Sequence, residues 1–473
     1  MKPLYLILSL GLVFSSSAHA ADERPFEIIN QYCATCHGPG LSGGRAPALR
    51  GNLRHVRNDQ DFARIIKEGL PVQGMPAFKA TLDDVEIATL VRTIRAFENR
   101  GIDRAREAIS FAQTSTFTTE LHEFKLEPVA SDLEVPWSFA FLPDERLLVA
   151  ERPGRLRIVD ADGLSTLIEG TPEVWNRQDG GLFSIALHPN YAKNGWIYLA
   201  FAHPGLEPAS SMTKVVRGQI RNARWVNEQV VWQAPSEHYL VGNIHYGSRL
   251  LFVGDQLLFS IGDRGQRDRA QQLESPFGKI HRINDDGTVP HDNPFAHSDD
   301  AVETIWSFGH RNPQGLAIDP RTRELWATEH GPLGGDELNS IRRGGNYGWP
   351  VVTHGVDDDG SIISMESSRP GMQDPAAHWS PSISPSTIEF YSAERFPEWK
   401  HNLFLGSLTG QELRRIEIQA NKVVKQEVLF KNLGRIRDIQ TGPDGYLYVA
   451  IERFGRYGQI VRLVPSSASR KGS

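Results

Sequence analysis

The sequence contains very little cysteine and no excess of positive charge. Only Cys33 and Cys36 among its 473 residues are cysteines, so the further thiolates of a four-cysteine zinc site do not exist. The formal net charge is −6, which argues against nucleic acid as a partner. The hydrophobic (40%) and charged (23%) fractions are those of an ordinary globular chain, and the length predicts at least two domains.

Long apolar runs are also missing after residue 20. No later segment has the roughly 18 consecutive apolar residues that span a bilayer, so we expect no transmembrane segment in the mature protein. Residues 1–20 combine Lys2, an apolar run over 4–14 and the small-x-small sequence Ala18-His19-Ala20. This pattern predicts a signal peptide cleaved near Ala20 and a periplasmic protein, with an uncleaved anchor as the alternative.

Both cysteines belong to one motif, Cys33-Ala34-Thr35-Cys36-His37. A C-x-x-C pair alone also occurs in redox dithiols and zinc sites. The histidine that follows, however, can ligate iron while both sulfurs bind the porphyrin edge. We therefore predict a covalently bound haem c with His37 as an iron ligand. Because both sulfurs are then used, we expect no disulfide.

A second iron ligand is expected from methionine, whose sulfur favours ferrous iron. Met75 is the one methionine of residues 21–105, and His55 is the alternative ligand. An amphipathic helix is predicted over 81–97, with an apolar face made by Leu82, Val85, Leu90, Ile94 and Phe97. The order C-x-x-C-H, loop, G-M-P and helix resembles a class I cytochrome c. This resemblance implies a small all-α domain at residues 21–105.

Beyond residue 120 a unit of apolar strand, turn with Pro or Gly beside Asp or Asn, and second apolar strand recurs six times. Its copies occupy residues 137–160, 182–201, 248–265, 315–331, 386–408 and 437–452. Repeats of short strands at this spacing are typical of a β-propeller, in which each blade is a four-stranded sheet. A β-sandwich would not explain the repeated turn signature.

We therefore predict an all-β six-bladed propeller over residues 123–466, with seven blades possible if one copy is degenerate. The strand at 459–464 is expected to close the ring by pairing with an early strand near 123–129. Residues 106–122 are interpreted as a linker and 467–473 as a disordered tail.

Four stretches carry polar residues where strands are expected to end. They are Asn243–Gly247 (NIHYG), Gly309–Gly315 (GHRNPQG), Thr328–Glu337 (TEHGPLGGDE) with Asn346–Pro350 (NYGWP), and Gly434–Asp438 (GRIRD). In this order the stretches resemble the soluble aldose sugar dehydrogenases that use pyrroloquinoline quinone (PQQ), the glucose/sorbosone dehydrogenase family. The resemblance covers about residues 125–465.

The resemblance implies roles for several residues of these stretches. His245 matches the general base that takes the proton of the sugar C1 hydroxyl. Arg311 and Asn312 are expected to face the quinone, with Arg311 also counted as catalytic, while Arg435 and Arg437 reach the cofactor from the last blade. Each arginine taken separately could instead form a structural ion pair.

The Thr328–Glu337 and Asn346–Pro350 stretches resemble the calcium region of the family. The carbonyls of Gly331 and Pro332 are implied to hold the calcium that polarises PQQ. A second, structural calcium is implied at Asp336, Glu337 and the Tyr347 carbonyl. A solvated acidic turn is the alternative for the two carboxylates.

The chain departs from the family pattern at two positions. Asp179 stands where the family often has Gln before a Gly-Gly pair, and Thr409 stands where it often has Lys. Loss of a cation near a tricarboxylate predicts weaker cofactor binding, by about 1–3 kcal/mol for a buried contact.

The leading hypothesis is a periplasmic enzyme that oxidises aldoses to lactones with PQQ and Ca2+ and passes electrons to its own haem. A downstream soluble or membrane-bound acceptor would then receive them, and a tethered cytochrome raises the effective concentration of the first acceptor. The alternatives are a calcium-dependent propeller lactonase and a non-catalytic sugar-binding propeller with a redox-sensing cytochrome.

Overall fold

A computed structural model describes residues 25, 28–33, 37, 41, 46, 49, 56, 58–70, 75–99, 115–357, 359–453 and 457–466. The predicted signal peptide, Cys36, His55 and the predicted tail lie outside the described residues. The chain divides into two compact units, Met1–Asp103 and Arg104–Ser473. In the parts described, no helix is both long enough and apolar enough to span a bilayer.

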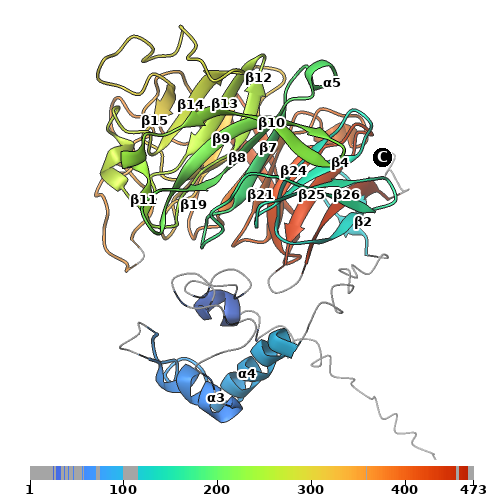
Figure 1. Cartoon of the computed structure of the whole chain (residues 1–473), viewed down its shortest axis with the longest axis vertical. Helices are drawn as coiled ribbons and strands as arrows, with labels where there is room; N and C mark the ends of the chain where they lie inside the picture. The colour runs from blue at the N-terminus through green and yellow to red at the C-terminus, as the bar shows by residue number, and fades with distance from the viewer. Residues whose placement is uncertain are drawn as a thin grey trace, which may run out of the picture. The chain divides into compact units, whose positions relative to one another are not determined.

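Two α-helices and a short π-helix, η1 (Ile29–Cys33), are described in the N-terminal unit (Figure 1). Helix α3 (Asp59–Glu68) begins after Asn58, whose side-chain oxygen accepts a hydrogen bond from the Asp61 backbone N–H at 2.8 Å. It ends at Gly69, which has a φ of 73°. Its apolar face buries Phe62, Ile65 and Ile66.

Helix α4 (Asp84–Asn99) confirms the helix predicted over 81–97. Asp83 and Glu86 form a reciprocal cap, in which Glu86 N donates to Asp83 Oδ1 at 2.7 Å and Asp83 N to Glu86 Oε2 at 3.1 Å. The expected apolar residues Leu82, Leu90 and Ile94 are buried. Val85 was predicted wrongly, since it is 74% exposed. It precedes Leu90 by five residues and is therefore rotated by about 140° around the helix. The Phe97 side chain lies outside the described part.

The second unit is a six-bladed propeller, as predicted, and each blade is an antiparallel sheet of four strands or more. Blade 1 contains β3 (Pro136–Phe141), β4 (Leu147–Glu151), β5 (Arg155–Val159) and β6 (Ser165–Ile168). Blade 2 contains β7 (Leu182–Leu187), β8 (Ile197–Pro204), β9 (Ser210–Arg221), β10 (Arg224–Gln233) and the short β11 (Leu240–Val241) beside β9. Blade 3 contains β12 (Leu250–Val253), β13 (Gln256–Ile261), β14 (Lys279–Asn284) and β15 (Ile305–Phe308).

The remaining blades repeat this order. Blade 4 contains β16 (Pro313–Ile318), β17 (Leu325–Glu329), β18 (Asp336–Ile341) and β19 (Ala377–Trp379), and blade 5 contains β20 (Pro385–Phe390), β21 (Leu403–Ser407), β22 (Glu412–Gln419) and β23 (Lys422–Lys431). Blade 6 contains β24 (Arg435–Thr441), β25 (Leu447–Glu452) and β26 (Gly458–Pro465), completed by β2 (Glu123–Leu133) and β1 (Phe117–Thr118). Short helices α5 (Tyr191–Asn194), η4 (Ser236–His238), η5 (Arg267–Ala270) and η6 (Pro397–Trp399) lie in the connections.

The ring is closed by β2, which pairs antiparallel with β26, so that the first and last parts of the propeller share one sheet. Leu126 pairs with Leu463 and Lys125 with Val464, which confirms the pairing predicted for 123–129 with 459–464. Each predicted repeat copy covers the first two strands of a blade, and the copy at 137–160 also covers the third strand, β5. Their apolar residues alternate and can face both neighbouring blades.

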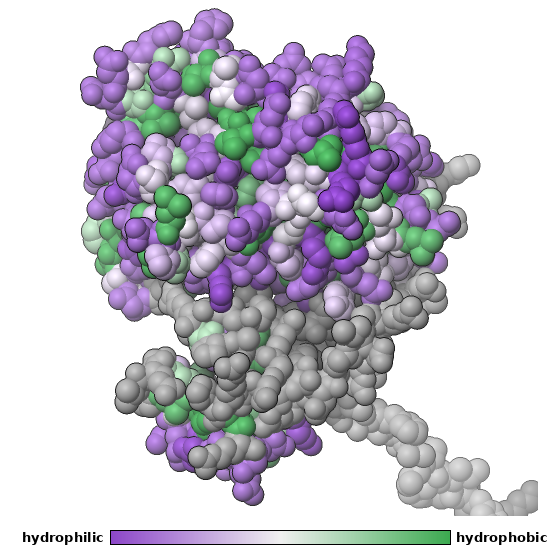
Figure 2. Space-filling view, viewed as in Figure 1, coloured by the Kyte–Doolittle hydropathy of each residue, from purple (hydrophilic) through white to green (hydrophobic). Residues whose placement is uncertain are grey.

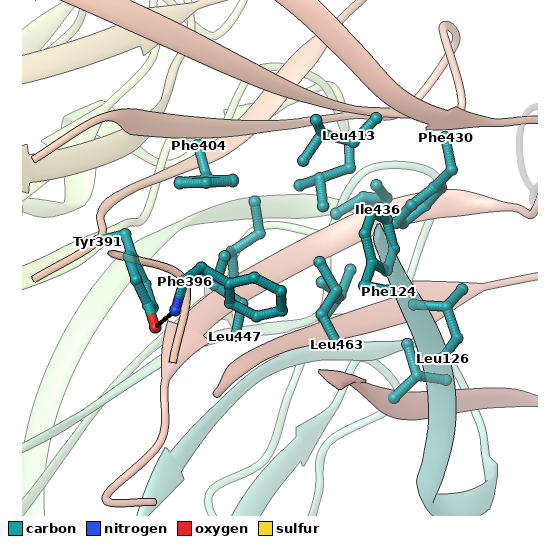
Figure 3. Close-up of a cluster of buried hydrophobic side chains, with 14 of the residues drawn as sticks. Phe124, Leu126, Tyr391, Phe396, Phe404, Leu413, Phe430, Ile436, Leu447 and Leu463 are labelled. Carbon is teal, nitrogen blue, oxygen red and sulfur yellow. Dashed lines mark hydrogen bonds between the residues drawn. The ribbon is translucent and has the colours of Figure 1, made fainter. Parts of the chain in front are cut away.

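Hydrophobic side chains fill the spaces between neighbouring blades. Figure 3 shows one such cluster, in which Phe404 and Leu413 of blade 5 lie near Ile436, Leu463 and Phe124 of blade 6. Most of its members are fully buried, and burial of each such side chain contributes about 1.5–3 kcal/mol. On the visible surface of the propeller, by contrast, Figure 2 shows mainly hydrophilic residues with apolar ones scattered between them.

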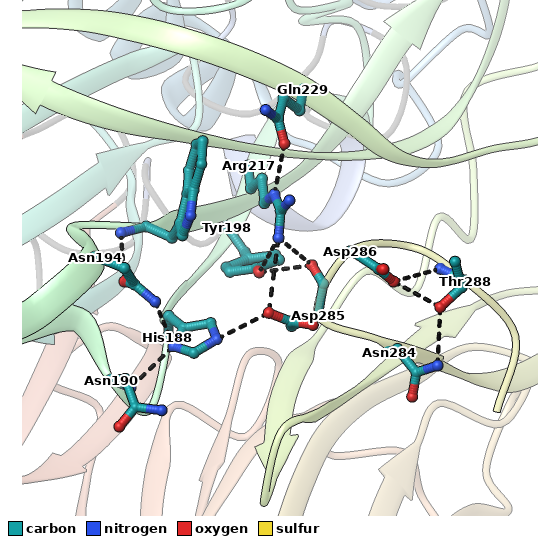
Figure 4. A network of polar contacts seen from close by, with 11 residues as sticks. His188, Asn190, Asn194, Tyr198, Arg217, Gln229, Asn284, Asp285, Asp286 and Thr288 are labelled. Carbon is teal, nitrogen blue, oxygen red and sulfur yellow. Dashed lines mark hydrogen bonds and ion pairs between the residues drawn. The ribbon is translucent and has the colours of Figure 1, made fainter.

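Polar contacts also join the blades, both at the ring axis and between neighbours. Arg249, directly before β12, is buried and forms an ion pair with Asp438 of β24 at 2.9 Å. Its guanidinium also donates hydrogen bonds to the backbone carbonyls of Gln314, Ser386 and Arg437. Between blades 2 and 3, His188 contacts Asp285, whose carbonyl accepts hydrogen bonds from Tyr198 and Arg217 (Figure 4). A cavity of ≈ 520 Å³ is lined by the inner strands and by the Arg249–Asp438 pair, but by none of the predicted site residues.

Candidate active site

The predicted propeller residues lie in loops that reach the same end of their blades. His245 precedes β12, Arg311 precedes β16 and Arg435 begins β24, while Gly331 lies in the turn between β17 and β18. Because neighbouring strands of a blade are antiparallel, the start of its first strand and the turn between its second and third strands share one end. Residues far apart in the sequence can therefore meet on one face.

His330, which is half-buried, lies beside these residues, and its carbonyl accepts a hydrogen bond from Arg311 Nη1 at 3.2 Å. Burial lowers its pKa to about 3, and the charges of Arg311, His245, Arg435 and Arg437 contribute in the same direction. Four of the predicted residues, from blades 3, 4 and 6, therefore lie within electrostatic range of one imidazole.

His245 is held by a carboxylate that the sequence analysis missed. Its Nδ1 lies 2.7 Å from Asp263 Oδ1, in the turn between β13 and β14. Burial opposes ionisation of Asp263, but the hydrogen bond from His245 and the charges of His245 and Arg311 outweigh it and lower the pKa of the carboxyl. An ionised carboxylate can only accept a hydrogen bond, so Nδ1 carries the proton and Nε2 is left as the acceptor.

Arg311 is fixed next to this pair by four contacts. Its backbone N donates to Glu329 Oε2 at 2.6 Å, and its Nη1 donates to the Gly331 carbonyl at 2.7 Å and the His330 carbonyl at 3.2 Å. Its guanidinium carbon lies 5.4 Å from the centre of the Trp349 ring, within cation–π distance. The Gly331 carbonyl predicted to hold calcium thus accepts a guanidinium hydrogen bond here.

Asn312 has a supporting contact in addition to its predicted role. The side chain is 4% exposed, and its Oδ1 accepts hydrogen bonds from Gly247 N and Gln314 Nε2, both at 3.1 Å. Gly247 follows His245 by two residues, so Asn312 connects the loop that carries His245 to blade 4.

A cluster of arginines surrounds Glu452 at the end of β25. Arg437 binds Glu452 Oε2 through Nε and Nη2, both at 2.6 Å, and Arg435 Nε lies 3.8 Å from the same oxygen. Burial opposes ionisation of Glu452, but the charges of Arg437, Arg435 and Arg152 lower its pKa to about 2. Three cations therefore gather around one carboxylate.

This cluster has more hydrogen-bonding capacity than the protein uses. The Nε atoms of Arg152 and Arg435 are buried and have no hydrogen-bond partner among the described residues. Such unpaired donors are costly when nothing accepts from them. Three carboxylates of PQQ would supply the missing acceptors, so these residues fit a polyanionic cofactor.

The predicted calcium region contains a small cavity of ≈ 10 Å³, about the room needed by one water molecule or ion. Among its lining residues are Glu329, Glu337 and Tyr347. Burial, followed by the charge of Glu329, raises the pKa of Glu337 to about 8. Asn339 Nδ2 donates to both carboxylates, at 3.2 and 3.0 Å. Two carboxylates beside an ion-sized space fit a divalent cation.

Asp336 was predicted as a ligand of the structural calcium, together with Glu337 and Tyr347. In the structure its carboxylate oxygens already accept hydrogen bonds from protein groups. Its carboxylate accepts hydrogen bonds from Gly331 N, Ser382 Oγ, Ile383 N and Ser384 N at 2.7–2.9 Å. These contacts fix the turn that carries Gly331 and the neighbouring Pro332.

The two departures from the family pattern lie at this end of the propeller as well. Asp179 is exposed, and its Oδ2 accepts a hydrogen bond from His245 N at 3.4 Å. Thr409 Oγ1 contacts Ser384 Oγ at 2.9 Å. A negative charge therefore lies next to the predicted base His245, and a neutral hydroxyl occupies the position of the expected cation.

Of the predicted haem ligands, the structure describes Cys33, His37 and Met75. His37 is 8% exposed and Cys33 is half-buried at the end of η1. Met75 is held by backbone hydrogen bonds with Leu70 in both directions, at 2.9 and 3.2 Å. This donor set of thiolate, imidazole and thioether suits a c-type haem.

Sequence reasoning missed Asp263, Arg152, Glu329 and Glu452. Three second strands end in glutamate, namely β4 (LLVAE), β17 (LWATE) and β25 (LYVAIE), and Asp263 follows β13 closely. The sequence signal for these residues was a carboxylate repeated at the end of the second strand in several blades. That end of the second strand lies at the same end of the blade as the predicted site residues.

Comparisons with known proteins match the two parts of the chain separately. Residues 133–462 match the family described as Glucose / Sorbosone dehydrogenase, and residues 20–92 match Cytochrome C oxidase, cbb3-type, subunit III. The aldose sugar dehydrogenase YliI of Escherichia coli (strain K12) is 36% identical over 348 residues, which are 72% of this chain and 92% of that protein.

Solved structures agree with these matches. A crystal structure of glucose dehydrogenase has a TM-score of 0.69 at 39% identity and covers 72% of this chain and 100% of its own. The PQQ-bound aldose sugar dehydrogenase of Streptomyces coelicolor has a TM-score of 0.60 at 29% identity, over 72% of this chain and 98% of its own. The predicted pairing of a cytochrome c domain with a sugar dehydrogenase propeller is confirmed.

Proposed function

The chain belongs to the glucose/sorbosone dehydrogenase family, and we propose that it oxidises the C1 hydroxyl of aldose sugars to the lactone with PQQ and Ca2+. The observation that carries the proposal is the His245–Asp263 pair beside Arg311 and an arginine cluster with unused donors. When bound, PQQ would supply the carbon that takes the hydride, Ca2+ would polarise it, and the haem would carry the electrons away.

His245 would act on the sugar itself. Asp263 holds its Nδ1 proton, so Nε2 accepts the proton of the C1 hydroxyl and the imidazolium that forms is stabilised by the carboxylate. Arg311 lies beside this pair, and its guanidinium donates hydrogen bonds to two backbone carbonyls. These contacts restrict the motion of the side chain and so fix the position of its positive charge.

The remaining residues would bind the cofactors. Arg311, Asn312, Arg435 and Arg437 would contact PQQ, and the unpaired Nε makes Arg152 a further candidate. The carbonyls of Gly331 and Pro332 would hold the calcium at the cofactor.

A second calcium would lie at the ion-sized cavity, with Glu337 and the Tyr347 carbonyl as ligands. Glu329 would add negative charge beside it, while its own oxygens accept hydrogen bonds from Arg311 N and Asn339 Nδ2. Asp336 would act by holding the turn, because its oxygens are already used.

In the N-terminal unit, Cys33 and Cys36 would bind a haem c whose iron is ligated by His37 and Met75. The signal peptide predicted at residues 1–20 supports a periplasmic location. The predicted haem c is consistent with it, because covalent haem attachment takes place outside the cytoplasm. A downstream soluble or membrane-bound protein would receive the electrons.

Reconstitution tests this proposal. The purified protein is freed of ligands, supplied with PQQ and Ca2+ separately and together, and given an aldose and an artificial electron acceptor. Lactone formation is expected only with both additions. Sugar lactone hydrolysis without PQQ would instead identify a lactonase, and sugar binding without either reaction would identify a binding protein.

A further inference from the structure

Trp349 donates the third hydrogen bond received by Asp263. Its indole Nε1 lies 2.8 Å from Asp263 Oδ2, while Oδ1 accepts hydrogen bonds from His245 Nδ1 at 2.7 Å and Gly265 N at 2.8 Å. The Asp263 side chain is 1% exposed, so bulk water cannot replace a missing donor. Both carboxylate oxygens are therefore held in place from opposite sides.

The indole is itself held firmly. Trp349 N donates to the Gly309 carbonyl at 2.9 Å, and the Trp349 carbonyl accepts a hydrogen bond from Gln271 Nε2 at 2.8 Å. The guanidinium carbons of Arg311 and Arg267 lie 5.4 and 5.9 Å from its ring centre. The ring thus has little freedom to move away from Asp263, and it joins the Asp263–His245 pair to Arg311.

Tryptophan can donate through Nε1 but cannot accept, which suits an acceptor-only carboxylate. We propose that Trp349 is a positioning residue of the proton-transfer step: it fixes the plane of the Asp263 carboxylate, which in turn holds His245 in the tautomer and orientation of a base. The inference rests on the proposed role of His245 in aldose oxidation.

The charged groups around the pair determine what loss of this bond should do. The Asp179 carboxylate accepts a hydrogen bond from the backbone N of His245. The charge of Arg311 lowers the pKa of Asp263, and His330 lies close enough to His245 for their charges to interact. None of these changes when the indole N–H is removed. Asp263 then loses a donor that stabilises its charge, so both members of the pair hold a proton more strongly. The acid limb of the kcat/KM profile should move to higher pH.

The test compares Trp349→Phe with Trp326→Phe. Trp326 lies in the same blade, is fully buried, and its Nε1 has no hydrogen-bond partner among the described residues. Both changes remove an indole N–H and the same volume, but only the first should lower kcat roughly tenfold to hundredfold and shift the acid limb. Equal effects of the two changes, or a loss at every pH without a shift, would overturn the proposal.

Two further measurements separate positioning from simple damage. In an Asp263→Asn background, Trp349→Phe should lower kcat no further, and a multiplied loss would show that Trp349 does not act through Asp263. An amino-acid analogue with benzothiophene in place of indole at position 349 removes the N–H while keeping the ring size, so it serves if Trp349→Phe does not fold. It should reproduce the shift, and a wild-type profile would refute the role.

The His245 imidazole can also be titrated by NMR in the ligand-free protein, which requires no activity. Trp349→Phe should raise its midpoint and Trp326→Phe should not. If the midpoint shifts but the wild type oxidises no aldose, the proposed function fails while the link from Trp349 to the pair stands. If aldoses are oxidised but the midpoint does not move, the inference about Trp349 fails and the function stands.

Discussion

Replacement of Glu452 by glutamine tests how the arginine cluster is organised. The change keeps the size of a side chain that is 3% exposed but removes the negative charge shared by Arg437, Arg435 and Arg152. The three cations would then lose the carboxylate that they share, which is unfavourable in a buried site.

The size of the effect follows from the pKa of Glu452. A fall from 4.5 to about 2 is about 2.5 units, and at 1.36 kcal/mol per unit it contributes about 3 kcal/mol to the free energy of unfolding. Because the folded pKa is depressed, this stability is fully present above pH 4.5 and is lost as the pH falls towards 2. For a propeller of roughly 340 residues, about 3 kcal/mol lowers Tm by about 4 °C.

Thermal unfolding of the ligand-free protein at pH 7 measures this change, and PQQ binding measured by fluorescence titration gives its consequence. Since the cations lack their internal partner in Glu452→Gln, the variant should bind PQQ more tightly, by about tenfold, although it is less stable. Asp319→Asn is the matched control: Asp319 follows β16 at the end away from the site, is 2% exposed and accepts hydrogen bonds from Arg321 Nε and Nη2 at 3.2 and 3.0 Å. It should lose stability without a change in PQQ affinity. An unchanged Tm in Glu452→Gln, or weaker PQQ binding, would refute the reasoning.

Three further outcomes are expected. Arg311→Gln should weaken PQQ binding in the same titration by more than Arg221→Gln does, because Arg221 lies on the exposed end of β9; equal losses would count against the site. Met75→Ala should abolish the sulfur-to-iron absorption band and lower the haem potential in a redox titration, whereas an unaltered spectrum would assign the sixth ligand elsewhere. Glu337→Gln should reduce the rise in Tm that Ca2+ gives to the chelator-treated protein, and a full rise would exclude Glu337 as a ligand.

The blades could be predicted because their signal is local. Alternating apolar residues around a Pro, Gly, Asp or Asn turn specify a pair of strands, and six copies specify the ring. The same reasoning failed for Val85, since a residue near the start of a helix can fit an apolar pattern without lying on the buried face. The buried face of a helix can be predicted reliably only from apolar residues that recur over several turns.

The partners of the predicted site residues could not be predicted in this way. His245 and Arg311 stand in recognisable motifs, but Asp263, Trp349 and Glu452 acquire their roles only where loops of different blades meet. Asp336 shows the converse case. Its acidic motif indicated a metal ligand, and only the folded chain reveals that four protein donors already surround it.

Stopped-flow spectroscopy of the haem tests the central claim most directly. The protein is loaded with PQQ and Ca2+, mixed with an aldose in the absence of dye, and followed at the ferrous haem band, with His245→Gln alongside. The wild type should reduce its haem, and the variant should do so about 10²–10⁴-fold more slowly, because loss of a general base has this effect. Equally rapid reduction in both would remove His245 from the mechanism. No reduction in the wild type would contradict electron transfer from the sugar to the protein's own haem.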